Sequence, residues 1–318
     1  MGSGPCTVAR LRPNWPLKVA FGLVKEIILR IASYQYQGRR HVGLVADDGQ
    51  SLHPFAVDAG RAQRGVLPLI EDRAVGTAWP APTGETLALA DVRLEAPLPL
   101  PRRNLFCVGR NYHAHAKELS SSVFKNNAAN PQEWPIVFTK VPECVIGPAD
   151  EVRLPGDTIS AQIDYEAELA VVIGKTGRNI ARAEAMSHIF GYTIVNDITA
   201  RDVQMRHQQW DLGKSFDTFC PMGPWIVSAD ALDGTQTRVR CWVNGELRQD
   251  ARTTDFIFDI PSLIETCSRG ITLYPGDVIA TGTPAGVGMG FTPPRYLKAG
   301  DTVRIEIDGL GTLENRFA

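Results

Sequence analysis

The stretch "DYEAELAVVIG", residues 164–174, constrains the fold more than any other part of the sequence. Apolar residues occupy both faces of this extended segment, a pattern typical of a strand that is buried on both sides. Glu166 and Glu168 are two positions apart, so both carboxylates project from the same face of the strand. Two carboxylates at the start of a buried strand repel each other and lose hydration, which is unfavourable unless a cation lies between them. The sequence therefore raises the question of which cation this is.

A second apolar segment supplies a third carboxylate. The expected strand "GYTIVND" (191–197) ends at Asp197, and neither histidine nor cysteine accompanies the three acids nearby in the sequence. Carboxylate oxygens suit Mg²⁺ or Mn²⁺, with Ca²⁺ as a further candidate, rather than zinc. Three carboxylates also leave coordination positions open for water or substrate. The alternative is that Asp197 caps the following turn while the two glutamates pair with arginines, and spacing alone does not separate these interpretations.

A third segment carries a candidate general base. In "FCVGRNYHAHAKEL" (106–119), a predicted strand passes through a glycine turn into a short helix. His115 and Glu118 are three positions apart and therefore share one face of that helix. A carboxylate next to an imidazole fixes its tautomer and raises its basicity, as is needed to take a proton from water. Taken alone, the pair is more typical of a solvated surface.

Composition and charge exclude several classes of protein. A chain of 318 residues can bury a sizeable core, and its net charge of -2 gives no electrostatic reason to expect a nucleic-acid or anionic-membrane partner. No apolar run approaches the roughly 18–20 residues that span a bilayer. The six cysteines are scattered without a C-x-x-C pair, which fits buried, reduced thiols rather than a zinc site. We therefore expect a cytoplasmic protein that has neither nucleic-acid nor membrane partners.

Changes in pattern along the chain suggest three parts. Residues 1–32 form an N-terminal extension of unassigned role, and charged residues interrupt its apolar run, which argues against a secretory signal. Residues 33–98 alternate between strand and turn patterns and predict a small β-rich domain. The proline-rich segment 95–104 is typical of an extended linker, and residues 100–318 form the main body.

Strand patterns dominate the body, so the predicted fold class is mostly β with α (α+β). A "VNGE" hairpin turn interrupts one of the expected strands, and "GDVIATGTPAGVGMG" (276–290) reads as a strand that enters a loop without the spacing of a dinucleotide site. Strands are predicted over 104–109, 168–174, 191–197, 237–248 and 302–309, and helices over 181–191 and 201–209.

Five motifs in a fixed order resemble the fumarylacetoacetate hydrolase superfamily over about residues 100–318. They are G-R-N-Y-x-x-H-x-x-E, D-Y-E-x-E-L-x-x-V-I-G, N-D-x-x-A-R-D-x-Q, G-K-S-F-D and T-G-T-P-x-G-V-G. The resemblance implies a mixed β-roll catalytic body, a homodimer, and Mg²⁺ or Mn²⁺ bound by Glu166, Glu168 and Asp197. It also implies that His115 with Glu118 is a catalytic dyad on a segment that orders over substrate. Further implied site residues are the catalytic Lys214 and the substrate-binding Arg201, Gln204 and Thr283.

One departure from the family pattern narrows the resemblance. The long eukaryotic-type member has an additional acidic metal ligand just before the dyad, whereas this chain has Gly109, Arg110 and Asn111 there. The chain is therefore more similar to the shorter bacterial branch of acylpyruvases, isomerases and decarboxylases.

Three functional hypotheses follow, two of them reactions of a 2-oxo acid that the resemblance implies and one from another class. The first is hydrolysis of a C–C bond in a 2,4-diketo acid of the acylpyruvate or fumarylpyruvate type. In that reaction His115 activates water, and the metal with Lys214 stabilises a pyruvate enolate. The second is decarboxylation or isomerisation of a 2-oxo dicarboxylic acid in aromatic compound catabolism, either oxaloacetate-like or from the homoprotocatechuate pathway, which passes through the same enolate. The third is a non-catalytic domain in which the ion only joins strands, and it leaves the dyad and Lys214 without a role.

Overall fold

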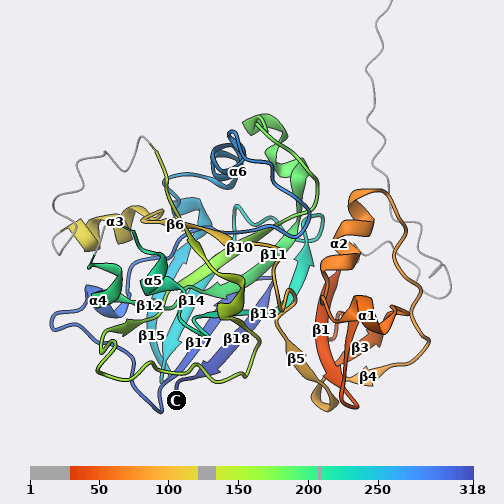
Figure 1. The fold of residues 1–318 in the computed structure, drawn as a ribbon, viewed down its shortest axis with the longest axis horizontal. Coiled ribbons are helices and arrows are strands. Elements are labelled where there is room, and N and C mark those ends of the chain that lie inside the picture. Colours follow the sequence, from red (N-terminus) through yellow and green to blue (C-terminus); the bar gives the residue numbers. More distant parts are fainter. Residues whose placement is uncertain (1–28, 121–133, 207–208) are drawn as a thin grey trace, which may run out of the picture.

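The computed structural model describes residues 29–120, 134–206 and 209–318 of the chain. Nearly all of the predicted N-terminal extension, residues 1–32, lies outside the described residues. The described part is built mainly of strands, with short helices around them (Figure 1). The predicted fold class, mostly β with α, is confirmed.

The largest sheet has 12 strands and joins the N-terminal strands to strands of the body. Its main path has the order β4-β3-β2-β1-β13-β11-β10-β16-β6-β7, while β5 pairs with β1 and β8 pairs with β13. The strands are β1 (Arg30–Tyr36), β2 (Arg39–Val45), β3 (Ser51–Pro54), β4 (Leu87–Ala88), β5 (Arg93–Glu95), β6 (Leu105–Gly109), β7 (Ile136–Lys140), β8 (Val145–Ile146), β10 (Ala167–Ile173), β11 (Ile189–Asn196), β13 (Cys220–Ser228) and β16 (Val278–Ala280).

Two smaller sheets complete the β structure. A four-stranded sheet has the order β15-β14-β17-β18, and a two-stranded sheet pairs β12 with β9. The predicted hairpin turn is present between β14 and β15, where Asn244 and Gly245 have φ values of 51° and 80°. The strands are β9 (Ile163–Asp164), β12 (Thr199–Ala200), β14 (Arg238–Val243), β15 (Glu246–Arg252), β17 (Thr302–Ile307) and β18 (Gly311–Arg316).

Six α-helices and several 3₁₀ helices connect these strands in the described residues. The helix predicted over 181–191 is a 3₁₀ helix at Arg182–His188, and its last residues belong to β11. Of the helix predicted over 201–209, the structure shows the single turn α4, and residues 207 and 208 lie outside the described residues. The α-helices are α1 (Ala59–Ala62), α2 (Leu67–Ala74), α3 (His113–Ser120), α4 (Arg201–Gln204), α5 (Asp211–Lys214) and α6 (Ile260–Ser268).

Strand β10 lies inside the large sheet between β11 and β16, and all seven of its residues are buried. Its burial on both faces confirms the prediction made from its apolar pattern. The predicted strand 164–174 is nevertheless interrupted after β9, and β10 begins at Ala167. In the link between them, the backbone N–H of Glu166 donates to the side-chain oxygen of Asn196 over 3.1 Å. The backbone oxygen of Glu166 accepts the N–H of Asp197 over 2.8 Å, so a side-chain and a backbone contact together hold Glu166 beside the end of β11.

The N-terminal strands continue the same sheet. Strand β1 pairs antiparallel with β13, with Arg30 opposite Val227, so the part before residue 98 shares backbone hydrogen bonds with the body. A separately folding domain over 33–98 stays a prediction.

The thiols of the described residues are buried, as the cysteine pattern predicts. The five cysteines in the described part of the chain are free and buried. Within the same residues, no helix is both long enough and apolar enough to cross a membrane.

Candidate metal centre and active site

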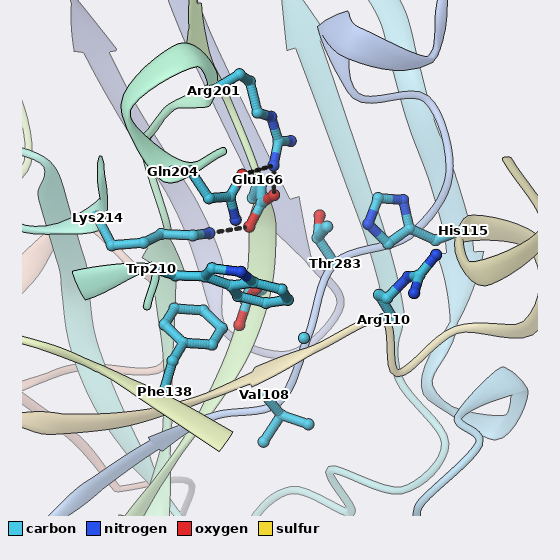
Figure 2. A pocket seen from close by; sticks show the side chains of 12 residues that line it. Val108, Arg110, His115, Phe138, Glu166, Arg201, Gln204, Trp210, Lys214 and Thr283 are labelled. Atoms are coloured by element: carbon cyan, nitrogen blue, oxygen red, sulfur yellow. Dashed lines mark hydrogen bonds and ion pairs between the residues drawn. The ribbon is translucent and has the colours of Figure 1, made fainter. Parts of the chain in front are cut away.

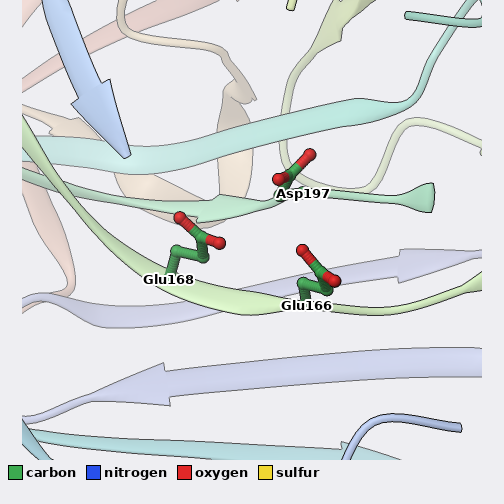
Figure 3. A group of neighbouring side chains, drawn as sticks. All are labelled: Glu166, Glu168 and Asp197. Carbon is green, nitrogen blue, oxygen red and sulfur yellow. The ribbon is translucent and has the colours of Figure 1, made fainter. Parts of the chain in front are cut away.

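Three carboxylates meet in the interior, as the sequence predicts. Side-chain oxygens of Glu166, Glu168 and Asp197 lie within 4.8 Å of one another, and all three residues are buried. Pairing of Ala167 with Asn196 places the start of β10 beside the end of β11, so the two segments bring their acids together (Figure 3). The cluster therefore follows from the strand register rather than from either segment alone.

Protein cations surround part of this cluster. The Lys214 ammonium lies 2.7 Å from Glu166 Oε2 and 2.7 Å from Asp197 Oδ2. Lys140 Nζ lies 2.8 Å from Asp197 Oδ1, and Arg201 Nη1 lies 2.7 Å from Glu166 Oε1. The alternative that the glutamates pair with arginine thus applies to Glu166.

Glu166 and Glu168 differ in their electrostatics although both are buried. Burial opposes ionisation of Glu166, but Lys214 and Arg201 outweigh it and lower its pKa to about 2. Burial, followed by repulsion from Asp197 and Glu166, raises the pKa of Glu168 well above its usual range. The backbone N–H of Gly282 donates to Glu168 Oε2 over 2.9 Å. Burial and repulsion from the other two carboxyl groups therefore act mainly on the pKa of Glu168, whereas nearby cations lower the pKa of Glu166.

A divalent cation fits this donor set. The three side chains offer hard carboxylate oxygens in a buried cluster, the chemistry preferred by Mg²⁺, Mn²⁺ and Ca²⁺. A positive ion among them would also relieve the repulsion that raises the pKa of Glu168. Glu166, Glu168 and Asp197 are consistent with a divalent metal site.

The two residues of the predicted dyad contact each other, with His115 buried and Glu118 partly buried. In α3, His115 Nδ1 lies 3.0 Å from Glu118 Oε2, and the His115 side chain is only 3 % exposed. The other carboxylate oxygen of Glu118 accepts the backbone N–H of Gly286 over 3.0 Å. A side chain at Gly290 would place its Cβ 2.1 Å from that oxygen, so glycine there gives the carboxylate room. The interpretation as a solvated surface pair does not apply.

One cavity brings together most of the residues predicted for the site. Figure 2 shows His115 and Arg110 on one side of it, with Arg201, Gln204 and Lys214 on the other. Glu118 and Asp197 lie behind this lining and contact His115 and Lys214, respectively. The residues that line the cavity are Val108, Gly109, Arg110, His115, Phe138, Glu166, Glu168, Arg201, Gln204, Trp210, Lys214 and Thr283.

The three residues predicted to contact substrate are held by neighbours. Arg201 Nε donates to Asp164 Oδ2 over 2.9 Å, and its Nη1 donates to the side-chain oxygen of Gln204 over 3.3 Å. The hydroxyl of Thr283 accepts a hydrogen bond of 2.7 Å from the Gln249 side chain. These contacts fix the orientation of the side chains, and their role towards substrate stays a prediction.

Lys140 was missed by the sequence reasoning. It ends β7, its side chain is fully buried, and its ammonium donates to the backbone oxygens of Ile198 (3.0 Å) and Lys214. Burial is the largest single effect and lowers its pKa, but Asp197 together with the nearby cysteines outweighs it, so the pKa of Lys140 lies above its ordinary value. The only signal in the sequence was a lysine at the end of an apolar strand, and such a residue is usually exposed.

An aromatic wall was also missed. Phe138 in β7 and Trp210 lie with ring centres 5.2 Å apart, and the Lys214 ammonium lies 4.8 Å from the centre of the Phe138 ring. Figure 2 shows both rings below Lys214 at the cavity. The wall provides an apolar side next to the charged cluster.

The chain is similar to several known proteins. The family model described as Fumarylacetoacetate (FAA) hydrolase C-terminal matches residues 104–318, more than half of the chain. Oxaloacetate tautomerase YisK of Bacillus subtilis is 44% identical over 307 residues, which cover 91% of this chain and 100% of that protein.

Solved structures of similar proteins share the fold. A fumarylacetoacetate hydrolase from Exiguobacterium antarcticum superposes with a TM-score of 0.77 at 39% identity, covering 91% of this chain and 99% of that one. A maleylpyruvate hydrolase from Sphingobium gives a TM-score of 0.72 at 32% identity, with 91% and 99% covered. Both likenesses include the N-terminal strands as well as the body.

Proposed function

The chain belongs to the fumarylacetoacetate hydrolase family, and from this premise we propose that it is a metal-dependent tautomerase of an oxaloacetate-like 2-oxo acid. The relative named oxaloacetate tautomerase matches over its whole length, which supports the isomerase hypothesis. Hydrolysis of a diketo acid is the first hypothesis from the sequence, and the similarity to a named tautomerase now favours the isomerase hypothesis over it.

The observation that carries the proposal is the contact of buried His115 with Glu118 at the cavity that Glu166 and Glu168 also line. Tautomerisation moves one proton between C3 and the oxygen on C2, so it needs a base beside C3. Because His115 Nδ1 is engaged by Glu118, the ring's Nε2 is the atom that takes the C3 proton. The same nitrogen returns the proton to the enolate oxygen, which completes the exchange without an attacking water.

Other residues of the chain hold the substrate and balance charge. When bound at Glu166, Glu168 and Asp197, a divalent ion would supply Lewis acidity that stabilises the enolate. Lys214 keeps two of these carboxylates in place through its ion pairs. We assign contacts with the substrate's oxygens to Arg201, Gln204 and Thr283, which line the cavity; a homodimer remains part of the proposal by analogy with the family.

Hydrolysis of a 2,4-diketo acid is the second candidate. The structural likeness to a maleylpyruvate hydrolase supports it, and the same dyad could deprotonate a water instead of C3. The two reactions differ in their products, because hydrolysis breaks a C–C bond and tautomerisation leaves the carbon skeleton intact.

The test follows the enol absorbance of oxaloacetate in the ultraviolet, with Mn²⁺ present, and identifies products by NMR. We expect enol–keto exchange with no loss of carbon, and exchange of deuterium at C3 in heavy water. His115→Asn should slow the exchange by about 10²–10⁴, the usual contribution of a general base. His113→Asn, an exposed histidine on the same helix, is the matched control and should retain activity. Pyruvate as the main product, or full activity of His115→Asn, would contradict the proposal.

A further inference from the structure

Arg110 lies in the link between β6 and α3 and lines the cavity on the same side as His115 (Figure 2). Its backbone is in the left-handed region, with φ at 57°. Residues other than glycine adopt this conformation rarely, because the side chain crowds the backbone. Such strain persists where the surroundings hold the residue, and it is concentrated at functional sites.

The neighbours of Arg110 hold this turn on both sides. The side chain of Asn111 donates to the backbone oxygens of Phe258 (3.0 Å) and Thr281 (2.8 Å), and its oxygen accepts the N–H of Phe258 over 2.8 Å. On the other side, a Cβ at Gly109 would lie 2.6 Å from the Trp210 ring, so the backbone packs directly on that ring. The arginine is thus presented to the cavity by a rigid turn.

Arg110, Arg201 and Lys214 are the three strong bases that line the cavity. Arg201 and Lys214 each contact the metal-binding carboxylates. Arg110 lies on the other side of the cavity, beside His115 of the dyad, and burial lowers its pKa. A partly desolvated guanidinium is stabilised by an anion, and its planar fork matches a carboxylate with two parallel hydrogen bonds.

We propose that Arg110 determines specificity by binding the second carboxylate, at C4, of a 2-oxo dicarboxylic acid. The 2-oxo acid head belongs at the three carboxylates with their ion, and C3 belongs beside His115. The C4 group then extends to the dyad's side of the cavity, where Arg110 lies. This inference rests on the proposed function, since it assumes that the head and C3 take those places.

The experiment compares two tautomerisation substrates on the Mn²⁺-loaded enzyme. Oxaloacetate carries the C4 carboxylate, whereas phenylpyruvate has an apolar ring there. Arg110→Met should lower kcat/KM for oxaloacetate by about 10- to 150-fold, the range for a hydrogen bond to a charged group, and change phenylpyruvate by less than about threefold. Arg110→Lys should lie between Arg110→Met and the wild type. Arg102→Met, an exposed arginine stacked on Tyr274, is the control and should behave as the wild type.

A binding measurement separates failure of this inference from failure of the proposed function. Calorimetry with oxalate, a mimic of the head alone, should give equal affinities for the wild type and Arg110→Met. Difluorooxaloacetate, which cannot enolise, should bind the variant about 10- to 150-fold more weakly. A wild type that binds difluorooxaloacetate but does not turn over oxaloacetate would contradict the tautomerase function and leave Arg110 supported by its binding difference. Equal loss for both substrates, equal affinity of both proteins for difluorooxaloacetate, or no wild-type binding of it would overturn the inference.

Discussion

Replacing Glu168 by glutamine tests the metal centre through stability rather than activity. Glu168 lies with Glu166 and Asp197 within 4.8 Å. At an effective dielectric constant of 20, two unit charges at that separation repel by about 3.5 kcal/mol. Glutamine keeps the shape and removes both repulsions. The ammonium groups nearby and proton uptake by Glu168 already relieve part of this energy, so we expect the metal-free variant to melt at the same temperature as the wild type or a few degrees higher.

The response to metal should be opposite. At a free Mn²⁺ concentration one hundred times the Kd, binding stabilises the wild type by about 2.7 kcal/mol. For a domain somewhat smaller than this chain, each kcal/mol shifts Tm by about 2–4 °C, so the wild type should gain about 5–10 °C. Glu168→Gln should gain almost nothing, because a neutral amide is a poor replacement for a carboxylate ligand.

Differential scanning calorimetry with and without Mn²⁺ measures both effects on one sample. Glu314→Gln, an exposed position in β18, is the matched control and should keep the full metal-dependent gain. A large fall in Tm of the metal-free Glu168→Gln variant would show that Glu168 is a structural residue. An undiminished gain with Mn²⁺ would refute the ligand assignment.

Two further predictions concern residues outside the predicted ligand set. Lys140→Met leaves Asp197 without one of its buried ion-pair partners, so the free energy of unfolding should fall by about 3–5 kcal/mol in denaturant titrations. A loss below about 1 kcal/mol, or an equal loss in the exposed control Lys298→Met, would refute this. Asp259 caps α6, so Asp259→Ala should lower stability by about 0.5–2 kcal/mol at neutral pH. Burial alone would raise the pKa of Asp259, but its contacts with Ser262 and Arg182 lower that pKa below its ordinary 3.8. The difference between wild type and Asp259→Ala should therefore persist above pH 3.8 and shrink as the pH falls through the lowered pKa, which acid titrations of both proteins would measure.

The parts of the fold that the sequence predicts are those encoded by local patterns. The strand β10 is apolar on both faces, and the turn at Asn244 and Gly245 is a hairpin signal. The dyad also follows from local spacing, because residues three apart on a helix are neighbours. These features depend on residues that are close in the sequence, so the chain itself specifies them.

Strand β13 was not predicted for a physical reason. Its sequence "CPMGPWIVS" contains two prolines, which lack the N–H needed for a central strand, and a glycine. The structure nevertheless places it between β1 and β11. Its pairing with β11 shifts register between Tyr192 and Ile194, near Gly223, so an irregular ladder accommodates the prolines. Tertiary packing here overrides the local signal.

Lys140 shows the same limit for the site. Its role depends on Asp197, which comes from a different strand far along the chain, and no spacing in the sequence connects the two residues. The convergence of Glu166, Glu168 and Asp197 was implied by the family resemblance, and the pairing of β10 with β11 produces it. The cations that meet them arrive from β7, α4 and α5, whose positions only the assembled sheet determines.

Asp164, the first acid of the segment 164–174, has a structural role that can be told apart from the chemistry of the site. It accepts the backbone N–H groups of Gly288 (2.6 Å) and Met289 (2.9 Å), together with Nε of Arg201. Asp164 therefore ties the loop after β16 to the strand and holds one edge of the guanidinium, while Glu166 takes Nη1. Within the described residues, the remaining Nη2 of Arg201 is buried with no hydrogen-bond partner. A buried donor of this kind is costly unless an acceptor meets it, and a carboxylate or oxo oxygen of the substrate is the acceptor that the proposed chemistry supplies. The predicted substrate role of Arg201 thus rests on this one atom, which Asp164 and Glu166 orient.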